Sequence, residues 1–409
     1  MSFKLRDYQE RISVEAAGIL KNHKICYLSM EVRCGKTLTA LNAAKLLGVK
    51  SVLFVTKKKA IGSIKGDYEM LNPDFAMEVI NYESVHKMTG IYDLIVLDEA
   101  HCMGAFPKPT NRTRTIKEVC QGKPIIYLSG TPTPESYSQI YHQFFVSSYS
   151  PFKAYASFYK WANMFVTKKE KFLYGKAVND YSEAKQEFIK KETDHLFLSF
   201  TQKQSGFEQK VTEKVLYCPM KPIIKTIIDR LRKDLVVEGK DDVILADTPV
   251  KLQQKIHQLS SGTVKGESGE GHILDDSKAV FIKKTFEGRK IAIYYKFKAE
   301  FEMLKQSFPN WTNSPEEFAE STDLVFLSQI VSGREGISLK TADALVFFNI
   351  DFSAVSYFQA KDRLTAKDRT KENTVYWIFS EGGIESKIYN CVKNKKDYTI
   401  NYFKQDYGK

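Results

Sequence analysis

Two short runs of residues have the types and spacing needed to bind and hydrolyse a nucleoside triphosphate. Gly35, Lys36 and Thr37 match the end of a phosphate-binding loop, where backbone N–H groups at a helix N-terminus surround phosphate oxygens. Lys36 would place its charge on the β- and γ-phosphates, and the Thr37 hydroxyl would bind Mg²⁺. Further along the chain, an apolar run ends in Asp98 and Glu99. Asp98 would hold Mg²⁺, directly or through water, and Glu99 would polarise the attacking water.

Each run has a simpler interpretation when it is taken alone. The glycine that opens the full phosphate-loop pattern is replaced by Met30, so the Gly-Lys-Thr triplet is a modest signal. The acidic pair would fit a helix cap after a core strand, but that interpretation leaves Lys36 unexplained. The two runs in this order, each after a predicted strand, favour an NTPase.

Bulk properties favour an intracellular protein with a polyanionic partner. The chain has 409 residues, 43% of them hydrophobic, and a net charge of +12. Nucleic acid is the leading candidate for that partner. The six cysteines form no C-x-x-C pair, which is typical of reduced thiols. We see no signal peptide and no apolar run long enough to span a bilayer. We therefore expect a soluble cytoplasmic protein, in the host cytoplasm if the source is viral.

Strands and helices alternate in the first 150 residues. Buried strands are predicted at 25–28, 51–56, 77–81, 92–97 and 124–128, and helices at 1–24 and 37–47. Strands that are apolar on both faces and separated by helices predict a parallel α/β sheet. Function is then expected at the carboxyl ends of the strands, where the two runs fall.

Composition changes after residue 150. Residues 151–210 contain eleven lysines, no arginine and thirteen aromatic residues. One interpretation is a small, mainly helical accessory segment whose rings form a core. The alternative is a basic surface whose rings stack on bases. The α/β pattern resumes at 211, so we expect domains at 1–150 and 211–409 with this segment between them.

The second domain is predicted from the same alternation of strands and helices. Strands are expected at 290–295, 323–327 and 344–348, helices at 221–238 and 297–308, and an exposed loop at 260–276.

In this order, the motifs resemble those of superfamily-2 helicases and translocases. Details are nearest to the SNF2-like group, especially compact DEAH-box enzymes encoded by bacteriophages. The resemblance covers about 6–150 and 211–390 and implies two RecA-like parallel-sheet domains in tandem. It rests on Leu5-Arg6-Asp7-Tyr8-Gln9, Glu31 to Thr37, Val52 to Lys59, Asp98-Glu99-Ala100-His101, Leu128 to Pro132, Ser332 to Leu339 and Gln359 to Arg363.

The resemblance implies a role for each of these motifs. The nucleotide would be bound by Arg6, Gln9, Arg33, Gly35, Lys36, Thr37, Gly336 and Arg369. Catalysis would involve Asp98, Glu99, Gln359 and Arg363, with Mg²⁺ held by Thr37 and Asp98. Coupling to nucleic acid would involve Lys57, Lys58, His101, Ser129 and Thr131. Gln9 would contact the adenine, and Arg363 would act as an arginine finger. A solvated loop remains the alternative for the lysines, and a capping or packing role for His101.

Two departures from the family pattern concern arginines. Arg33 occupies a position usually held by glycine, and Ala366 stands where the family has a second arginine. Arg369 is our first candidate to replace that arginine, because a guanidinium suits phosphate oxygens better than an ammonium does. Arg33 is the second candidate and Arg334 a further one. The alternative is that one finger suffices.

The expected function is an ATP- and Mg²⁺-dependent DNA helicase or translocase in replication, recombination or repair. Its partner would be branched, forked or duplex DNA, with other replication or recombination proteins as possible partners. An RNA helicase and a motor subunit of a larger nucleic-acid-processing complex are the alternatives. A module that binds ATP only as a structural ligand is less favoured, because such a site has no need of Glu99.

Overall fold

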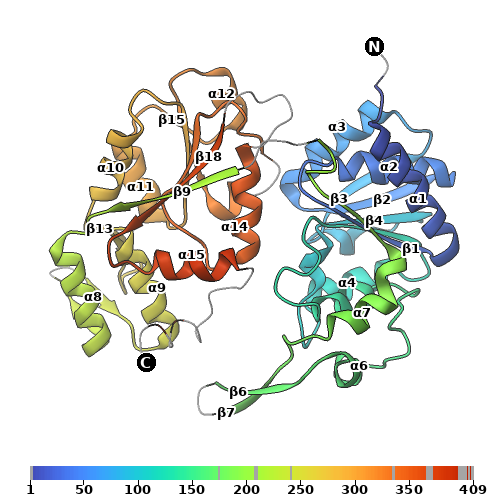
Figure 1. The fold of residues 1–409 in the computed structure, drawn as a ribbon, viewed down its shortest axis with the longest axis horizontal. Helices are drawn as coiled ribbons and strands as arrows, with labels where there is room; N and C mark the ends of the chain where they lie inside the picture. The colour runs from blue at the N-terminus through green and yellow to red at the C-terminus, as the bar shows by residue number, and fades with distance from the viewer. Residues whose placement is uncertain are drawn as a thin grey trace. The chain divides into compact units, whose positions relative to one another are not determined.

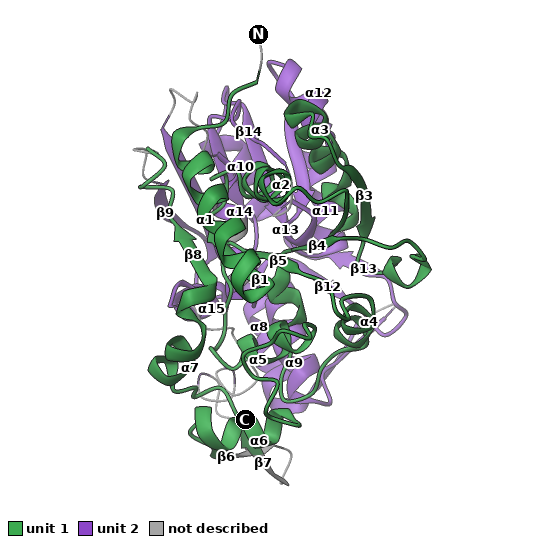
Figure 2. Ribbon diagram, turned by 90° about the vertical axis from the view of Figure 1, so that its right-hand side faces the viewer, with its two compact units in different colours: residues 1–207 green, residues 208–409 purple. Residues whose placement is uncertain are grey.

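A computed structural model describes residues 3–173, 176–206, 211–239, 242–333, 337–364, 372–394, 403 and 406. The chain divides into two compact units, residues 1–207 and 208–409, shown in different colours in Figure 2. Each unit contains a six-stranded sheet with helices packed on it. This confirms the predicted α/β fold of two RecA-like parallel-sheet domains. The division at residues 150 and 210 stays a prediction.

The first sheet has the strand order β3-β2-β4-β5-β1-β8, and every pair of neighbours is parallel. Its strands are β1 (Ile25–Met30), β2 (Ser51–Thr56), β3 (Ala76–Asn81), β4 (Leu94–Asp98), β5 (Ile125–Leu128) and β8 (Phe197–Phe200). The predicted strands of this domain are confirmed, with small shifts at their ends. Because all strands run the same way, their carboxyl ends meet at one edge of the sheet.

Helices cover both faces of this sheet (Figure 1). They are α1 (Asp7–His23), α2 (Lys36–Leu47), α3 (Ile61–Leu71), α4 (Asn111–Val119) and α5 (Gln139–Phe145), with short 3₁₀ turns η1 (Lys58–Ala60), η2 (Val85–Lys87) and η3 (Ala100–Met103). Alternate strand residues serve opposite faces, because side chains of a strand alternate in direction. Cys26 and Leu28 pack with α1 and α2, whereas Ile25 and Tyr27 pack with α5.

The segment after residue 150 contributes both to the core and to the sheet. It contains α6 (Phe158–Phe165), β6 (Lys169–Leu173), β7 (Lys176–Asp180), α7 (Gln186–Thr193), η4 (Asp194–Leu196) and the edge strand β8. Trp161 and Phe158 are buried, whereas Tyr159, Met164 and Phe188 are exposed. Most of the described rings therefore form a core, as in the first interpretation. The β6–β7 hairpin projects from the unit in Figure 1.

The second sheet is also parallel throughout, with the order β15-β16-β14-β17-β18-β9. Its strands are β9 (Val211–Cys218), β14 (Ile291–Tyr295), β15 (Trp311–Thr312), β16 (Val325–Gln329), β17 (Ala344–Phe347) and β18 (Asn373–Ser380). The three predicted strands of this domain are confirmed, with small shifts at their ends. The sequence analysis did not predict β9, β15 or β18.

The helices of the second unit begin and end at clear local signals. They are α8 (Pro222–Asp234), α9 (Pro249–Ser260), α10 (Ser277–Thr285), α11 (Lys298–Ser307), α12 (Pro315–Glu320), α13 (Ile330–Gly333), α14 (Ala354–Lys361) and α15 (Glu385–Lys393), with the 3₁₀ turn η5 (Asp362–Leu364). α8 is shorter than predicted because Leu235 is left-handed, with φ 62°. The next residues form β10 (Val236–Glu238), which pairs with β11 (Val243–Leu245).

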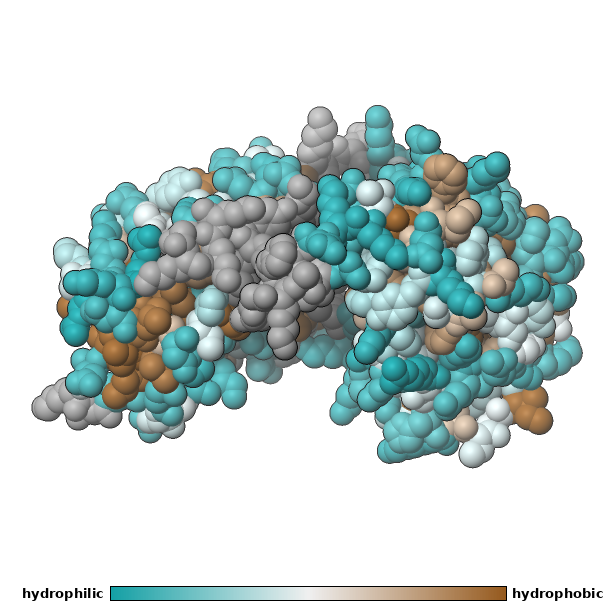
Figure 3. Space-filling model, turned by 90° about the horizontal axis from the view of Figure 1, so that it is seen from below, coloured by the Kyte–Doolittle hydropathy of each residue, from teal (hydrophilic) through white to brown (hydrophobic). Residues whose placement is uncertain are grey.

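The predicted exposed loop at 260–276 is wrong. Its residues form a hairpin of β12 (Thr263–Lys265) and β13 (Gly271–Ile273). A distant carboxylate holds this hairpin, because Asp242 accepts hydrogen bonds from the Ser268 hydroxyl and from His272. Composition alone could not reveal that partner. Figure 3 shows that polar residues cover most of the face drawn, with an apolar patch in the part of the second unit that carries α8 and α9.

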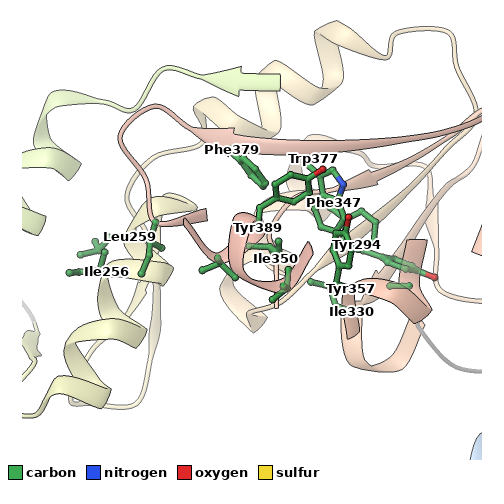
Figure 4. Close-up of a cluster of buried hydrophobic side chains, with 14 of the residues drawn as sticks. Ile256, Leu259, Tyr294, Ile330, Phe347, Ile350, Tyr357, Trp377, Phe379 and Tyr389 are labelled. Atoms are coloured by element: carbon green, nitrogen blue, oxygen red, sulfur yellow. The ribbon is translucent and has the colours of Figure 1, made fainter. Parts of the chain in front are cut away.

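The larger core of the second unit contains a group of packed aromatic rings among its aliphatic residues (Figure 4). The rings of Phe347 and Trp377 are stacked with centroids 3.9 Å apart, and Tyr357 also stacks on Trp377, with centroids 5.3 Å apart. Tyr389 packs against the same indole at 5.5 Å. These rings join two strands to α14 and α15.

The carboxylate of Glu213, on β9, lies among these rings. It accepts hydrogen bonds from the Tyr357 hydroxyl at 2.7 Å and from the Trp377 indole at 3.0 Å. Lys361 and the Tyr389 hydroxyl contact it at 3.2 and 3.3 Å. Burial alone would raise the pKa of Glu213, but the bond from Tyr357 and the charge of Lys361 bring it below its usual value. The folded state therefore favours the ionised form.

Removing this carboxylate should destabilise the second unit. We expect Glu213→Ala to lower the free energy of unfolding by about 2–4 kcal/mol, because four donors lose their acceptor. Glu213→Gln should lower the free energy of unfolding less than Glu213→Ala does at pH 7. Its deficit should shrink as pH falls below the ordinary glutamate pKa of about 4.3, because the stabilising effect of the ionised carboxylate is lost as pH falls toward its lowered pKa in the folded state. Urea unfolding at pH 7 and pH 3 measures the free energy of unfolding of both variants. Glu320→Gln, at an exposed position of α12, is the control. An equal deficit for Glu213→Gln at both pH values would contradict the ionic contribution.

Candidate nucleotide-binding site

The phosphate loop connects β1 to α2 and turns sharply. Arg33 and Gly35 are both left-handed, with φ of 65° and 73°. A non-glycine residue in this conformation costs about 1–2 kcal/mol. This is the physical reason why the family pattern has glycine where Arg33 stands. The N–H of Cys34 donates to the Glu31 carbonyl at 3.3 Å and closes the turn.

Lys36 is the first residue of α2 and folds its side chain back over the loop. Its Nζ lies 3.0 Å from the Met30 carbonyl oxygen and 3.3 Å from that of Glu31. Thr37 follows in the first turn of the helix, partly buried. A side chain on Gly35 would come within 2.2 Å of the Gln9 amide, so this glycine is required by close approach as well as by its φ.

α1 holds the loop from one side through Gln9. The Gln9 side chain is 3% exposed, and its Nε2 donates to the Gly35 carbonyl at 3.3 Å. Its Oε1 accepts the backbone N–H of Arg6 at 3.0 Å. The structure therefore links Arg6 and Gly35 through the Gln9 side chain. Their contacts with nucleotide, including adenine contact by Gln9, stay predictions.

The acidic pair lies at the end of β4, next to the phosphate loop, with Asp98 as the last residue of the strand and Glu99 directly after it. The Asp98 carboxylate accepts the Thr56 hydroxyl at 2.8 Å. Burial, and then the neighbouring charge of Glu99, raises the pKa of Asp98 to about 6, although Lys36 acts in the opposite direction. Glu99 adopts a left-handed backbone with φ 50°, which is a strained conformation for this residue type.

His101 connects the acidic pair to the segment after β5. Its Nδ1 lies 3.2 Å from a Glu99 carboxylate oxygen and 3.0 Å from the Ser129 hydroxyl. Ser129 is buried, and its hydroxyl also accepts the Thr131 N–H at 3.1 Å. The buried Thr131 hydroxyl has no hydrogen-bond partner in the described part of the chain. A Cβ on Gly130 would lie 3.4 Å from the Met30 carbonyl, so this segment also borders the phosphate loop.

The structure gives fewer contacts, or none, for the other predicted site residues. Lys57 and Lys58 follow β2 at the same edge, Lys57 partly buried and Lys58 exposed. In the second unit, Arg363 is 8% exposed in η5, and its carbonyl accepts the Leu339 N–H at 3.1 Å. Gln359 belongs to α14, but its side chain lies outside the described set. The remaining predicted positions, Gly336, Arg369 and Arg334, also lie outside the described residues.

The sequence analysis missed one contact to the phosphate loop. The backbone N–H of Gln202 donates to the Glu31 carboxylate at 2.7 Å, and its side-chain Nε2 donates to the Val32 carbonyl at 3.0 Å. Gln202 follows β8 and belongs to no recognisable motif. A correct prediction of the pairing between β8 and β1 would have been needed to find it, because that pairing places Phe200 beside Met30.

The residues present fit a Mg²⁺ ion. Thr37 and Asp98 offer oxygen ligands, which Mg²⁺ prefers. A bound cation would also offset the cost of ionising Asp98 beside Glu99. No cluster of three or more His, Cys, Asp and Glu side chains suited to a metal occurs among the described residues.

Comparisons with known proteins find similarity to chromatin-remodelling ATPases. No family model matches the chain. It is 33% identical over 88 residues to the chromatin-remodelling ATPase INO80 of Mycosarcoma maydis, which is 22% of this chain and 4% of that protein. The human INO80 is 34% identical over 82 residues, 20% of this chain and 5% of that protein. For Gibberella zeae INO80 the identity is 25% over 148 residues, 32% of this chain and 8% of that protein.

The chain thus covers less than a tenth of the length of each of these relatives. These relatives give no support to the bacteriophage DEAH-box type, which stays a prediction. No helix in the described part of the chain has the length and apolarity of a membrane span. The cytoplasmic location stays a prediction.

The raised pKa of Asp98 predicts a pH-dependent cost of folding. The pKa of an aspartate in an unfolded chain is ~3.9. Above about pH 6 Asp98 is ionised in the folded state too, where burial and the charge of Glu99 make the carboxylate unfavourable. Asp98→Asn should therefore raise the melting temperature by about 2–5 °C at pH 8 in EDTA, and this gain should vanish near pH 4. Thermal unfolding at both pH values measures the effect. Asp74→Asn, an exposed position before β3, should show no such gain, and a gain at pH 4 equal to that at pH 8 would refute the electrostatic cause.

Proposed function

We propose that this protein is an SNF2-like superfamily-2 motor that couples ATP hydrolysis to movement along or remodelling of DNA. One observation carries the proposal. The phosphate loop with Lys36, the acidic pair Asp98 and Glu99, and the His101–Ser129 contact all meet at the carboxyl edge of one parallel sheet. The similarity to chromatin-remodelling ATPases supports the same class.

Each residue of this edge has a defined task in hydrolysis. Backbone N–H groups at the start of α2 and the Lys36 ammonium bind the phosphates of ATP. Thr37 and Asp98 hold Mg²⁺, which supplies charge neutralisation at the phosphate oxygens. Glu99 accepts a proton from the water that attacks the γ-phosphate. Arg6, Gln9 and Arg33 lie on the nucleotide side of the loop.

The second unit supplies the remaining groups. Arg363 stabilises negative charge that develops on the transferred phosphoryl group, and Gln359 orients the water. Gly336 and Arg369 complete the nucleotide contacts from this unit. His101 couples changes at Glu99 to Ser129 and Thr131, and these residues couple them to the segments that contact the nucleic-acid strand. Lys57 and Lys58 contact the phosphate backbone of the nucleic acid.

DNA is the proposed polymer, and its branched, forked or duplex forms are the proposed substrates. The net charge of +12 suits a polyanion, and the relatives to which the chain is similar are chromatin-remodelling ATPases. Contacts to phosphates make binding largely independent of sequence. Other replication or recombination proteins are the proposed partners, and the site of action is the cytoplasm.

Substitutions at the phosphate loop and the acidic pair test the hydrolysis. Lys36→Ala should reduce DNA-stimulated ATP turnover to background, because the phosphates lose their ammonium partner, while the melting temperature stays within about 2 °C. Glu99→Gln should keep ATP binding and lose at least about 100-fold in kcat. Lys45→Ala, on the exposed side of α2, serves as the control. Turnover by Glu99→Gln at the wild-type rate would refute the role of Glu99.

A test of polymer choice compares ATPase stimulation by single-stranded, forked and duplex DNA and by RNA. Stimulation by RNA alone would overturn the proposal for DNA.

The projecting β6–β7 hairpin is a proposed DNA contact. Replacing residues 170–179 by a two-residue glycine turn should weaken DNA binding about 5- to 20-fold at low salt and reduce the slope of log affinity against log salt. The base of the hairpin should survive, because the Thr167 N–H donates to the Glu183 carbonyl and Val166 pairs with Ala184. A double variant that keeps the whole hairpin, Lys171→Gln with Lys176→Gln, tests whether the charge of the hairpin or its shape is responsible for DNA binding. Unchanged affinity and salt slope in both variants would exclude the hairpin from DNA binding.

A further inference from the structure

A short turn follows β8 and ends the first unit. Residues 201–206 form this turn, which we call the brace turn. Its own hydrogen bonds fix its shape, because the Thr201 N–H donates to Gln204 Oε1 at 2.8 Å and the Ser205 N–H donates to the Thr201 carbonyl at 3.2 Å. The Ser205 hydroxyl also donates to the Gln202 carbonyl at 2.7 Å. The brace turn is thus a rigid local structure and not an open loop.

The brace turn touches the phosphate loop at successive residues. Gln202 donates from its backbone to the Glu31 carboxylate and from its side chain to the Val32 carbonyl. The N–H of Glu31 in turn donates to the Phe200 carbonyl at 2.9 Å, at the start of the brace turn. Two residues after Val32, buried Cys34 and buried Ser205 contact each other with 3.8 Å between sulfur and oxygen.

These contacts fix the half of the loop that Gln9 does not reach. Gln9 holds the carbonyl of Gly35, whereas Gln202 holds the carbonyl of Val32, directly before the left-handed Arg33. Rotation of the peptide between Val32 and Arg33 would redirect an N–H group of the loop. Because phosphate binding depends on N–H groups that converge on the anion, this peptide has to be held in place.

We propose that Gln202 is a positioning residue for nucleotide binding, and that the brace turn couples the phosphate loop to the chain that enters the second unit. The proposal rests on the proposed nucleotide-binding function. Only residues 207–210 separate the brace turn from β9, whose first residue is Val211. A nucleotide that fixes the loop therefore also fixes the brace turn, and with it the end of the connection between the units.

Substitutions in the brace turn test the positioning role. Gln202→Ala should raise the dissociation constant for Mg²⁺·ADP and the KM for ATP about 5- to 10-fold, on the scale of one lost hydrogen bond, with kcat within about twofold of wild type. Gln202→Glu should weaken binding further, because a carboxylate cannot donate to the Val32 carbonyl and repels Glu31. Lys203→Ala, exposed in the same turn, is the matched control. Calorimetry, steady-state kinetics and thermal unfolding supply the readouts.

Hydrogen exchange of the wild-type protein tests the coupling without any substitution. Amides of Gln202 and Ser205 should exchange at least about fivefold more slowly with saturating Mg²⁺·ADP, while those of the β6–β7 hairpin should not change. Unchanged ADP affinity and KM in a folded Gln202→Ala variant would overturn the positioning role. Unchanged exchange in the brace turn would overturn the coupling. A wild-type protein that binds no nucleotide would overturn the proposed function itself, which the wild-type titration alone reveals.

Discussion

Elements outside the phosphate loop help to hold its backbone in shape. Its left-handed residues include Arg33, which lacks the conformational freedom of glycine. Two glutamines from distant parts of the chain compensate, since Gln9 binds the carbonyl of Gly35 and Gln202 binds that of Val32. The loop is therefore defined by tertiary contacts more than by its own sequence. This explains how a phosphate loop with few glycines can form at all.

The second constraint is electrostatic. Asp98 and Glu99 are adjacent carboxylates at the buried end of β4, and their mutual repulsion adds to the cost of burial. Lys36 offsets part of this cost, and a divalent cation with its phosphates would offset more. The strained backbone of Glu99 and its contact with His101 fit a residue that is held for chemistry and not for packing. The adjacent carboxylates thus lower the stability of the folded state, and a bound cation would neutralise the charge that Lys36 does not offset.

Local sequence patterns predicted most of the central strands and the edge where the motifs meet, because buried parallel strands are apolar runs that end in functional residues. They did not predict β8, β9 or β18, whose neighbours in the sheets are distant in sequence. Gln202 was missed for the same reason, as its partners precede it by about 170 residues. The hairpin after residue 260 was missed because a distant carboxylate, Asp242, holds it. Pairings over such separations leave no local signature.

The connection between the units is flanked by residues that hold the proposed catalytic groups within each unit. Before it, Gln202 holds the phosphate loop. After it, Glu213 binds Tyr357 and Lys361 on α14, the helix that leads into Arg363. Coupling between sites requires contiguous contacts with defined geometry, and these contacts supply them on both sides of a short stretch of chain. The residues that flank the connection therefore set the geometry of proposed catalytic groups, each within its own unit.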